Sequence, residues 1–196
     1  MNFRPLGRIR FILTFGSILF ALTQCEAADP TKAATRSKAE TTIAASSQQD
    51  KYSFVMFWKQ QDEATNTMWK NLQAGLADRS KQAAWVAVLV NVPSEAALVN
   101  RFVVSRAPMP LMLAVAPNGA VTASYAKVLD VTKIDNAFVT PTMTRCMLAM
   151  QHRKVVLLCV HGDDQCVVPS GVREFNAILC YQKTSQILHM DVNDPA

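Results

Sequence analysis

The sequence predicts an α/β protein: a three-layer sandwich on a mixed sheet, followed by a partial second strand–helix–strand unit. Short apolar runs alternate with amphipathic stretches from residue 51 onward. The run at 83–92 is apolar almost throughout, which is typical of a parallel strand covered on both faces. A Pro-Asn-Gly turn at 117–119 joins two further runs and indicates an antiparallel hairpin. Half of the 196 residues are apolar, which is enough for a packed core.

The N-terminus has the pattern of an export signal. A basic start with three arginines precedes an uncharged apolar run at 11–22, and small residues follow at Cys25 and Ala27. This order is typical of a secretory signal peptide over residues 1–27, and the run is short for a membrane span. We therefore expect an exported protein of the periplasm or cell envelope.

Two alternatives for this N-terminus stay open. The apolar run could remain as an uncleaved anchor. Leu-Thr-Gln-Cys at 22–25 is also similar to the lipidation motif of bacterial lipoproteins, although Gln24 is larger than the residue usual there. In each case the membrane is contacted only through the signal or a lipid anchor at Cys25.

Composition limits the remaining classes of partner. Without residues 1–27 the chain has 17 Lys+Arg against 14 Asp+Glu, so much of its basic character belongs to the signal. It has no dense Lys/Arg cluster interleaved with aromatic residues, so nucleic-acid binding has no support. Residues 28–50 contain almost no large apolar side chain, and we expect them to form a flexible tether.

The elements expected between residues 51 and 152 come in the order strand, helix, strand, helix, strand, strand, helix. They are a strand at 52–58, a helix from Asp62 to Leu76, a strand at 83–92, a short helix at 93–102, strands at 111–116 and 120–128, and a helix over 132–153 that Pro141 restarts.

This order resembles the thioredoxin fold, and particular residues carry the resemblance. Phe57-Trp58 stands where thioredoxins end their central strand with Phe-Trp, and the segment 106–110 is similar to the one that carries the family's cis-proline. Pro110 is the matching position. The resemblance covers residues 51–152 and implies a groove for extended peptides, lined by Trp58, Asp62, Met109 and Pro110.

The cysteine pair of the family is missing. Counted from Trp58, its two positions are Asp62 and Thr65, and residues 51–140 contain no cysteine. Thioredoxin chemistry needs a thiolate at the helix start and a second thiol one turn later. We therefore expect no catalytic residue in this unit, and a capping role for Asp62.

After residue 152 the pattern begins again. A strand at 154–160, a helix at 170–181 and a strand at 186–192 repeat the earlier order about 100 residues later. We expect the helix to turn Val172, Phe175, Ile178 and Leu179 inward. This pattern predicts an internal duplication whose second unit, 153–196, is partial. The sequence could be a fragment, and the alternative is that these strands extend one sheet.

Four cysteines lie in this C-terminal part: Cys146, Cys159, Cys166 and Cys180. Their pairing stays open, because four cysteines allow three connectivities. We expect Cys159 and Cys180 to be buried as small apolar groups. Cys166 lies in the loop between strand and helix, and it is the candidate for a redox or disulfide role. His161, Asp163 and Asp164 are too few for a metal site, so we expect neither metal nor other cofactor.

The sequence thus predicts a redox-inactive thioredoxin-like protein of the cell envelope that binds a protein or extended peptide. We expect binding and not catalysis. The first alternative is a thiol–disulfide oxidoreductase that uses the C-terminal cysteines. The second is a structural module of a larger envelope protein. The partner and the oligomeric state stay open.

Overall fold

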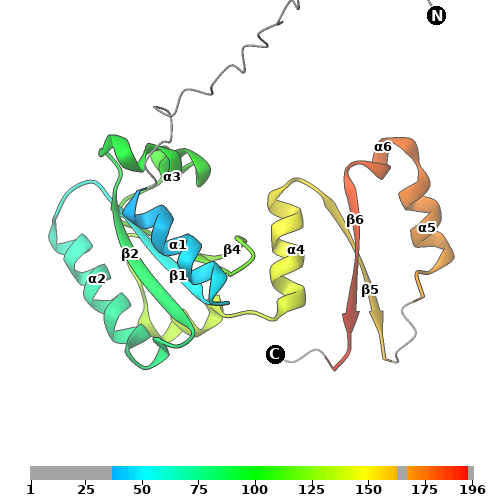
Figure 1. Ribbon diagram of the computed structural model, residues 1–196, viewed down its shortest axis with the longest axis horizontal. Helices are drawn as coiled ribbons and strands as arrows, with labels where there is room; N and C mark the ends of the chain where they lie inside the picture. Colours follow the sequence, from blue (N-terminus) through cyan, green and yellow to red (C-terminus); the bar gives the residue numbers. More distant parts are fainter. Residues whose placement is uncertain (1–36, 163–166, 194–196) are drawn as a thin grey trace, which may run out of the picture. The chain divides into compact units, whose positions relative to one another are not determined.

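The computed structural model describes residues 37–162 and 167–193 (Figure 1). Its larger sheet has the order β2-β1-β3-β4. The strands are β1 (Tyr52–Trp58), β2 (Ala83–Leu89), β3 (Leu111–Val115) and β4 (Val121–Ala126). β1 pairs parallel with β2 and antiparallel with β3, and β3 pairs antiparallel with β4. The predicted mixed sheet is confirmed.

Helices cover both faces of this sheet. Side chains alternate along β1, so Val55 and Phe57 face one layer while Phe54 and Met56 face the other. The Phe54 face packs on α2 (Glu63–Leu76), whose Met68, Leu72 and Leu76 are buried. The opposite face packs on α1 (Lys38–Gln48) and α3 (Ala96–Arg101). The domain is therefore a three-layer sandwich.

Helix α1 corrects the expected tether at 28–50. Ser37 caps the helix: its side chain accepts a hydrogen bond from the Glu40 N–H, and the Glu40 carboxylate accepts one from the Ser37 N–H. Ala39 and Ile43 lie in the core against β1 and β2. Residues 38–48 are thus part of the domain. The capping box stabilises the start of the helix, and the two apolar side chains pack it against the sheet. The rest of the expected tether, 28–36, lies outside the described residues, as does the expected signal.

The expected helix over 132–153 is two separate helices. A 3-10 helix, Val131–Ala137, packs beside α2, and its Ile134 is fully buried. A Cβ at Gly75 would collide with Ile134, so glycine allows this close approach. The chain then leaves helical geometry, and α4 (Pro141–Gln151) begins after its N-cap Thr140. Proline at the first position favours this new start.

The remaining elements form a second strand–helix–strand unit. They are β5 (Val155–His161), α5 (Ser170–Ala177), α6 (Leu179–Gln182) and β6 (Ser185–Asp191). β5 and β6 pair parallel with each other, in a sheet separate from the larger one. Among the described strands, they therefore do not extend the first sheet. Within the same described part, no helix is both long and apolar enough to cross a bilayer.

The helices before β1 and β5 share their capping geometry. Ser37 and Thr140, 103 residues apart, are the N-caps of α1 and α4, and each accepts a hydrogen bond from the N–H three residues later. Both helices have 11 residues, and α4 contacts β5 and β6 as α1 contacts β1 and β2.

The turns into the two strands also correspond at this spacing. Asp50 and Arg153 both adopt left-handed φ angles, 55° and 59°. The next N–H in each turn reaches back five residues, from Lys51 to Ser46 O at 2.9 Å and from Lys154 to Ala149 O at 3.0 Å. The two turns therefore have the same backbone geometry.

The second unit is more open than the first. α5 has no buried residue, and the helix stops where Ile178 adopts an extended conformation. Val172 and Phe175 are half-buried, but Ile178 and Leu179 are 48% and 86% exposed, so their expected inward orientation is wrong. A sheet of two strands offers too little surface to cover the whole predicted helix.

Candidate functional site

The candidate site lies where β1 ends and α2 begins. Asp62 is the N-cap of α2, and its Oδ1 accepts a hydrogen bond from the Thr65 N–H at 2.8 Å. The Thr65 hydroxyl donates to the Gln60 carbonyl at 2.9 Å. These bonds tie the loop to the first turn of the helix. Positions 62 and 65, where the resemblance to thioredoxins predicts cysteines, hold a carboxylate and a hydroxyl.

The electrostatics of Asp62 match a cap. The Thr65 backbone N–H, followed by the Thr65 side chain, lowers the pKa of the Asp62 carboxyl below its ordinary value. The carboxylate therefore stays ionised near neutral pH, where its charge favours the positive end of the helix dipole. A side chain that must stay ionised is poorly suited to transfer protons at neutral pH.

A small apolar hollow lies beside this cap. Its volume is about 180 Å³, and it is lined by Met56, Trp58, Gln61, Thr65, Asn66, Trp69 and Ala87. Binding sites for small molecules usually enclose about 300–1,000 Å³. The hollow is therefore smaller than most sites that bind small molecules.

The four predicted groove residues are only partly brought together. Trp58 lines the hollow and Asp62 caps the adjoining helix, but Met109 and Pro110 are not among the lining residues. The Met109–Pro110 peptide bond is cis, as the resemblance implies. Pro110 is buried, and half-buried Met109 packs with the core on the α1 face, whereas Trp58 packs with the core on the α2 face.

Strand β2 adds a feature that the sequence did not reveal. It lies at the edge of the sheet and pairs only with β1 among the described strands. Ala87, on this edge strand, is exposed and lines the hollow. An apolar run of this kind predicts a strand covered on both faces, and β2 does contribute Val88 to one core and Ala83 to the other. These two are its only buried residues, because β2 lies at the edge of the sheet. Periodicity within one strand does not show whether a neighbour lies on each side.

The cysteines divide by burial. Cys146 and Cys159 are buried free thiols, so the expectation for Cys159 is confirmed. Cys180 is an exposed free thiol, and the expectation that it is buried is wrong. It lies in α6, which begins only after the break at Ile178 and has no buried residue. Cys166 lies outside the described residues. Within the described ranges, no three His, Cys, Asp or Glu side chains gather as metal ligands would.

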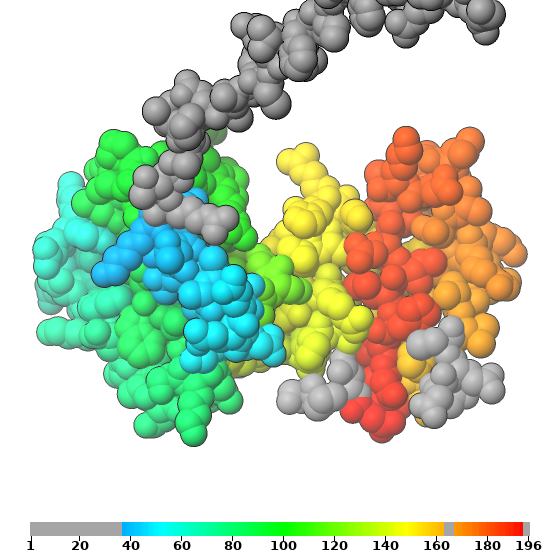
Figure 2. All heavy atoms as spheres, in the orientation of Figure 1, coloured from blue at the N-terminus to red at the C-terminus, as the bar shows by residue number. Residues whose placement is uncertain are grey.

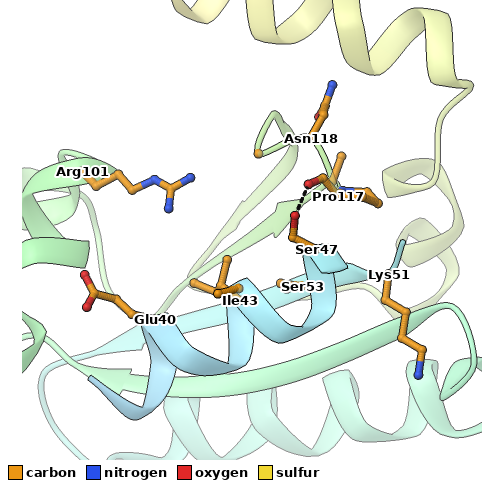
Figure 3. A pocket seen from close by; sticks show the side chains of 11 residues that line it. Glu40, Ile43, Ser47, Lys51, Ser53, Arg101, Pro117 and Asn118 are labelled. Carbon is orange, nitrogen blue, oxygen red and sulfur yellow. Dashed lines mark hydrogen bonds between the residues drawn. The ribbon is translucent and has the colours of Figure 1, made fainter. Parts of the chain in front are cut away.

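A second, more polar hollow lies between α1, the end of α3 and the turn at 116–119 (Figure 3). Its volume is about 360 Å³. Ile43 forms its apolar wall, while Glu40, Lys51 and Arg101 add charges of both signs. The Ser47 hydroxyl donates to the Pro117 carbonyl at 2.6 Å and ties α1 to the turn. Sequence reasoning missed this hollow because residues 38–48 were expected to be a tether.

Known proteins resemble this chain only in fold. No family model and no curated protein matches the sequence. The germline-specific thioredoxin Deadhead of Drosophila melanogaster is 20% identical over 52% of this chain and 90% of its own, with a TM-score of 0.40. Thioredoxin O2 of Arabidopsis thaliana is 14% identical, over 51% and 84%, with a TM-score of 0.40. A mutant thioredoxin from Halobacterium salinarum is 13% identical, over 54% and 90%, also at 0.40.

The sheet itself identifies the fold. A parallel β1–α2–β2 unit is followed by an antiparallel β3–β4 hairpin, and β1 pairs with both β2 and β3. Helices α1 and α3 cover one face, and α2 covers the other. The larger sheet and its helices have a thioredoxin-like fold.

Proposed function

We propose that this chain is an exported thioredoxin-like binding module without thiol–disulfide activity, and that it binds an extended peptide segment of a protein. The observation that carries the proposal is the open edge of β2 beside the hollow at Trp58. A peptide that adds as a strand to β2 would satisfy main-chain groups along this edge. One of its side chains would enter the hollow.

The geometry of β2 supports this binding mode. The Val90 N–H donates to the Trp58 carbonyl, and the Tyr52 N–H donates to the Gln82 carbonyl, so even-numbered residues of β2 direct their backbone toward β1. Because backbone directions alternate, Trp85 and Ala87 direct theirs to the open edge. The site is apolar with a few polar side chains, a composition that suits recognition of one apolar residue in a peptide.

The absence of redox activity rests on the residues at the helix start. Asp62 and Thr65 cannot form a mixed disulfide with a substrate or resolve one. The purified chain should not reduce insulin, and Cys166→Ser should leave that result unchanged. Reduction by the chain that Cys166→Ser abolishes would establish the oxidoreductase alternative instead. The double variant Asp62→Cys/Thr65→Cys serves as the positive control, because it restores sulfur at the positions that the resemblance predicts.

Peptide binding can be tested with a displayed library of random peptides. Affinity for the selected peptides is then measured for the native chain, Trp58→Ala and Ala87→Lys, with Val128→Lys as matched control. Val128 is 73% exposed and lies outside the hollow. We expect a loss of about tenfold or more for the first two variants and none for the control, since one well-placed aromatic residue often contributes over 1.4 kcal/mol. Unchanged affinity in correctly folded Trp58→Ala and Ala87→Lys would refute the site.

Export has its own support and its own test. The basic start, the apolar run and the small residues near Ala27 occur in the order that signal peptidase recognises. In a bacterial host, the mature chain should appear in the periplasmic fraction with Ala28 as its first residue. A chain that keeps its N-terminus, or one that carries lipid on Cys25, would show that one of the membrane-attached alternatives is right.

A further inference from the structure

We propose that a third hollow binds a small carboxylate with an apolar body, and that Arg101 holds the carboxylate group. This hollow lies between the end of α3, the β3–β4 hairpin and α4, and its volume is about 560 Å³. It shares no lining residue with the hollow at Trp58, so binding here is independent of peptide binding at β2.

The hollow has the size and the wall of a small-molecule site. Its volume of about 560 Å³ falls within the roughly 300–1,000 Å³ that is usual for such sites. Four side chains form the apolar part of its wall: Phe102, Leu113, Val121 and Leu148. Leu113 is buried in the core, and the other three are half-buried. A ligand with an apolar body would remove their remaining surface from water, which is favourable.

The part of the wall that belongs to α4 is tied to the hairpin. The Val121 N–H donates to Gln151 Oε1 at 3.0 Å, and Gln151 Nε2 donates to the Val121 carbonyl at 2.7 Å. These two bonds hold Leu148, one turn earlier in α4, beside the first residue of β4. The hollow is therefore formed before a ligand arrives, which lowers the entropic cost of binding.

Arg101 supplies the charge, and its guanidinium has a defined place. Its Cζ lies 5.1 Å from the centre of the Phe102 ring, a distance at which cation and ring attract each other. Its Nη2 lies 3.4 Å from the point that a Cβ on Gly119 would occupy, and Gly119 has a φ of 89°. Glycine at this position thus allows both the turn and the close approach of the guanidinium. Figure 3 shows the Arg101 side chain extending from the end of α3 toward the turn that carries Asn118.

The guanidinium has no anionic partner within the ranges that the structure describes. Neither of the two ion pairs found there involves Arg101. Its N–H donors form a planar fork that matches the two oxygens of a carboxylate. Arg101 lines the polar hollow beside α1 as well, but that hollow includes the Glu40 carboxylate, whereas no Asp or Glu lines this one. The apolar body of a bound carboxylate would therefore extend into this hollow, away from Glu40.

Two further lining residues favour an anion. Asn118 Oδ1 accepts a hydrogen bond from the Ala120 N–H at 3.0 Å, which leaves the Asn118 Nδ2 donors to contact a ligand. The one other titratable lining residue is His152, which is either neutral or positive. The lining therefore never carries a negative charge, and its charge is complementary to a carboxylate.

Octanoate is a suitable probe, because it joins a carboxylate to a flexible apolar chain. Isothermal titration calorimetry of the purified chain should show one octanoate site and an affinity for 1-octanol, the uncharged analogue, that is at least about tenfold lower. Arg101→Leu should weaken octanoate binding at least about tenfold, because a hydrogen-bonded charge pair is lost. Arg106→Leu is the matched control and should leave the affinity unchanged, since Arg106 is exposed and does not line the hollow.

Filling the hollow tests its location. Leu148→Trp should weaken octanoate binding at least about tenfold, because the larger side chain takes up the apolar volume. Met150→Trp on the same helix is its control, since Met150 is 54% exposed and lies outside the lining. Circular dichroism establishes that each variant folds.

The site must also be distinct from the peptide site. Trp58→Ala should leave octanoate binding unchanged, so a failure of one proposal can be told from a failure of the other. No binding of octanoate, equal affinities for octanoate and 1-octanol, or equal losses in Arg101→Leu and Arg106→Leu would overturn the proposal.

Discussion

The docking of α1 can be tested by one substitution, Ile43→Ala. Ile43 is 7% exposed and packs in the core with Val55 and Phe57. The substitution removes three buried carbon atoms, and each contributes about 0.8 kcal/mol through its transfer from water. The cavity that remains adds to this loss, so the free energy of unfolding should fall by about 2.5–4 kcal/mol. If residues 38–48 were a solvated tether, the change would be close to zero.

Urea denaturation measures the difference. With an m-value of about 1–3 kcal/mol/M, a loss of about 3 kcal/mol lowers the midpoint by roughly 1 M or more. Gln48→Ala is the matched control in the same helix, because Gln48 is exposed. Its effect should stay within about 0.5 kcal/mol. Ser37→Ala should cost an intermediate amount, about 1 kcal/mol, because it removes the cap.

The same control identifies the result that would contradict the docking of α1. Equal midpoints for Ile43→Ala and Gln48→Ala would mean that α1 does not contribute to the core in solution. The m-values must agree with that of the native chain, since a changed m-value would indicate a different unfolding reaction. A lowered midpoint in both variants would mean that the loss is not specific to the packing of Ile43.

Three further predictions concern thiols, acid and backbone strain. Alkylation followed by peptide mapping should modify exposed Cys180 well before buried Cys146 and Cys159 in the native chain. Equal alkylation rates for all three would contradict the burial of Cys146 and Cys159. The pKa of the Asp62 carboxyl in the folded state lies below the ordinary 3.8, so on acidification the unfolded state is protonated first. The free energy of unfolding should therefore fall as the pH drops from about 4 through the folded pKa. Asp62→Asn should make the acid side of the stability profile shallower, and an unchanged profile would contradict the cap. Val103 has a left-handed φ of 52° and is 77% exposed. Val103→Gly should therefore raise the free energy of unfolding by about 0.5–1 kcal/mol, because glycine adopts this conformation without strain. Urea denaturation measures the change, and a decrease would contradict backbone strain at Val103.

The sheet could be predicted because its information is local. Strands that are buried on both faces, such as β3, are apolar throughout, and the Pro-Asn-Gly turn fixes the hairpin. The start of α2 was also predictable, since Asp62 is a strong N-cap and the apolar residues behind it recur with helical spacing.

Other features could not be predicted because they arise from packing. α1 has Ile43 as its one large buried side chain, so it lacks the apolar periodicity of an amphipathic helix. Its capping box was the available signal, with Ser37 and Glu40 three residues apart. The hollow at Trp58 combines residues from β1, α2 and β2, and no single segment carries its pattern. The exposed edges of β2 and β5 depend on which strands are neighbours, which an apolar run does not specify.

The break between the 3-10 helix and α4 bears on the origin of the second unit. Ile134 and Ala137, on one side of the break, belong to the core that packs on α2. After Thr140, α4 contacts β5 and β6 and repeats the cap and turn geometry of α1. The break therefore separates the helix that packs on α2 from the helix that packs on β5 and β6. We therefore propose that the second unit begins at Thr140, thirteen residues before the start at 153 that the sequence predicted, and that it arose by duplication of the α1–β1–α2–β2 half. On this view α1 and α4 are equivalent helices, and the edge of β5 is exposed because the second unit lacks a counterpart of β3 in the part that the structure describes.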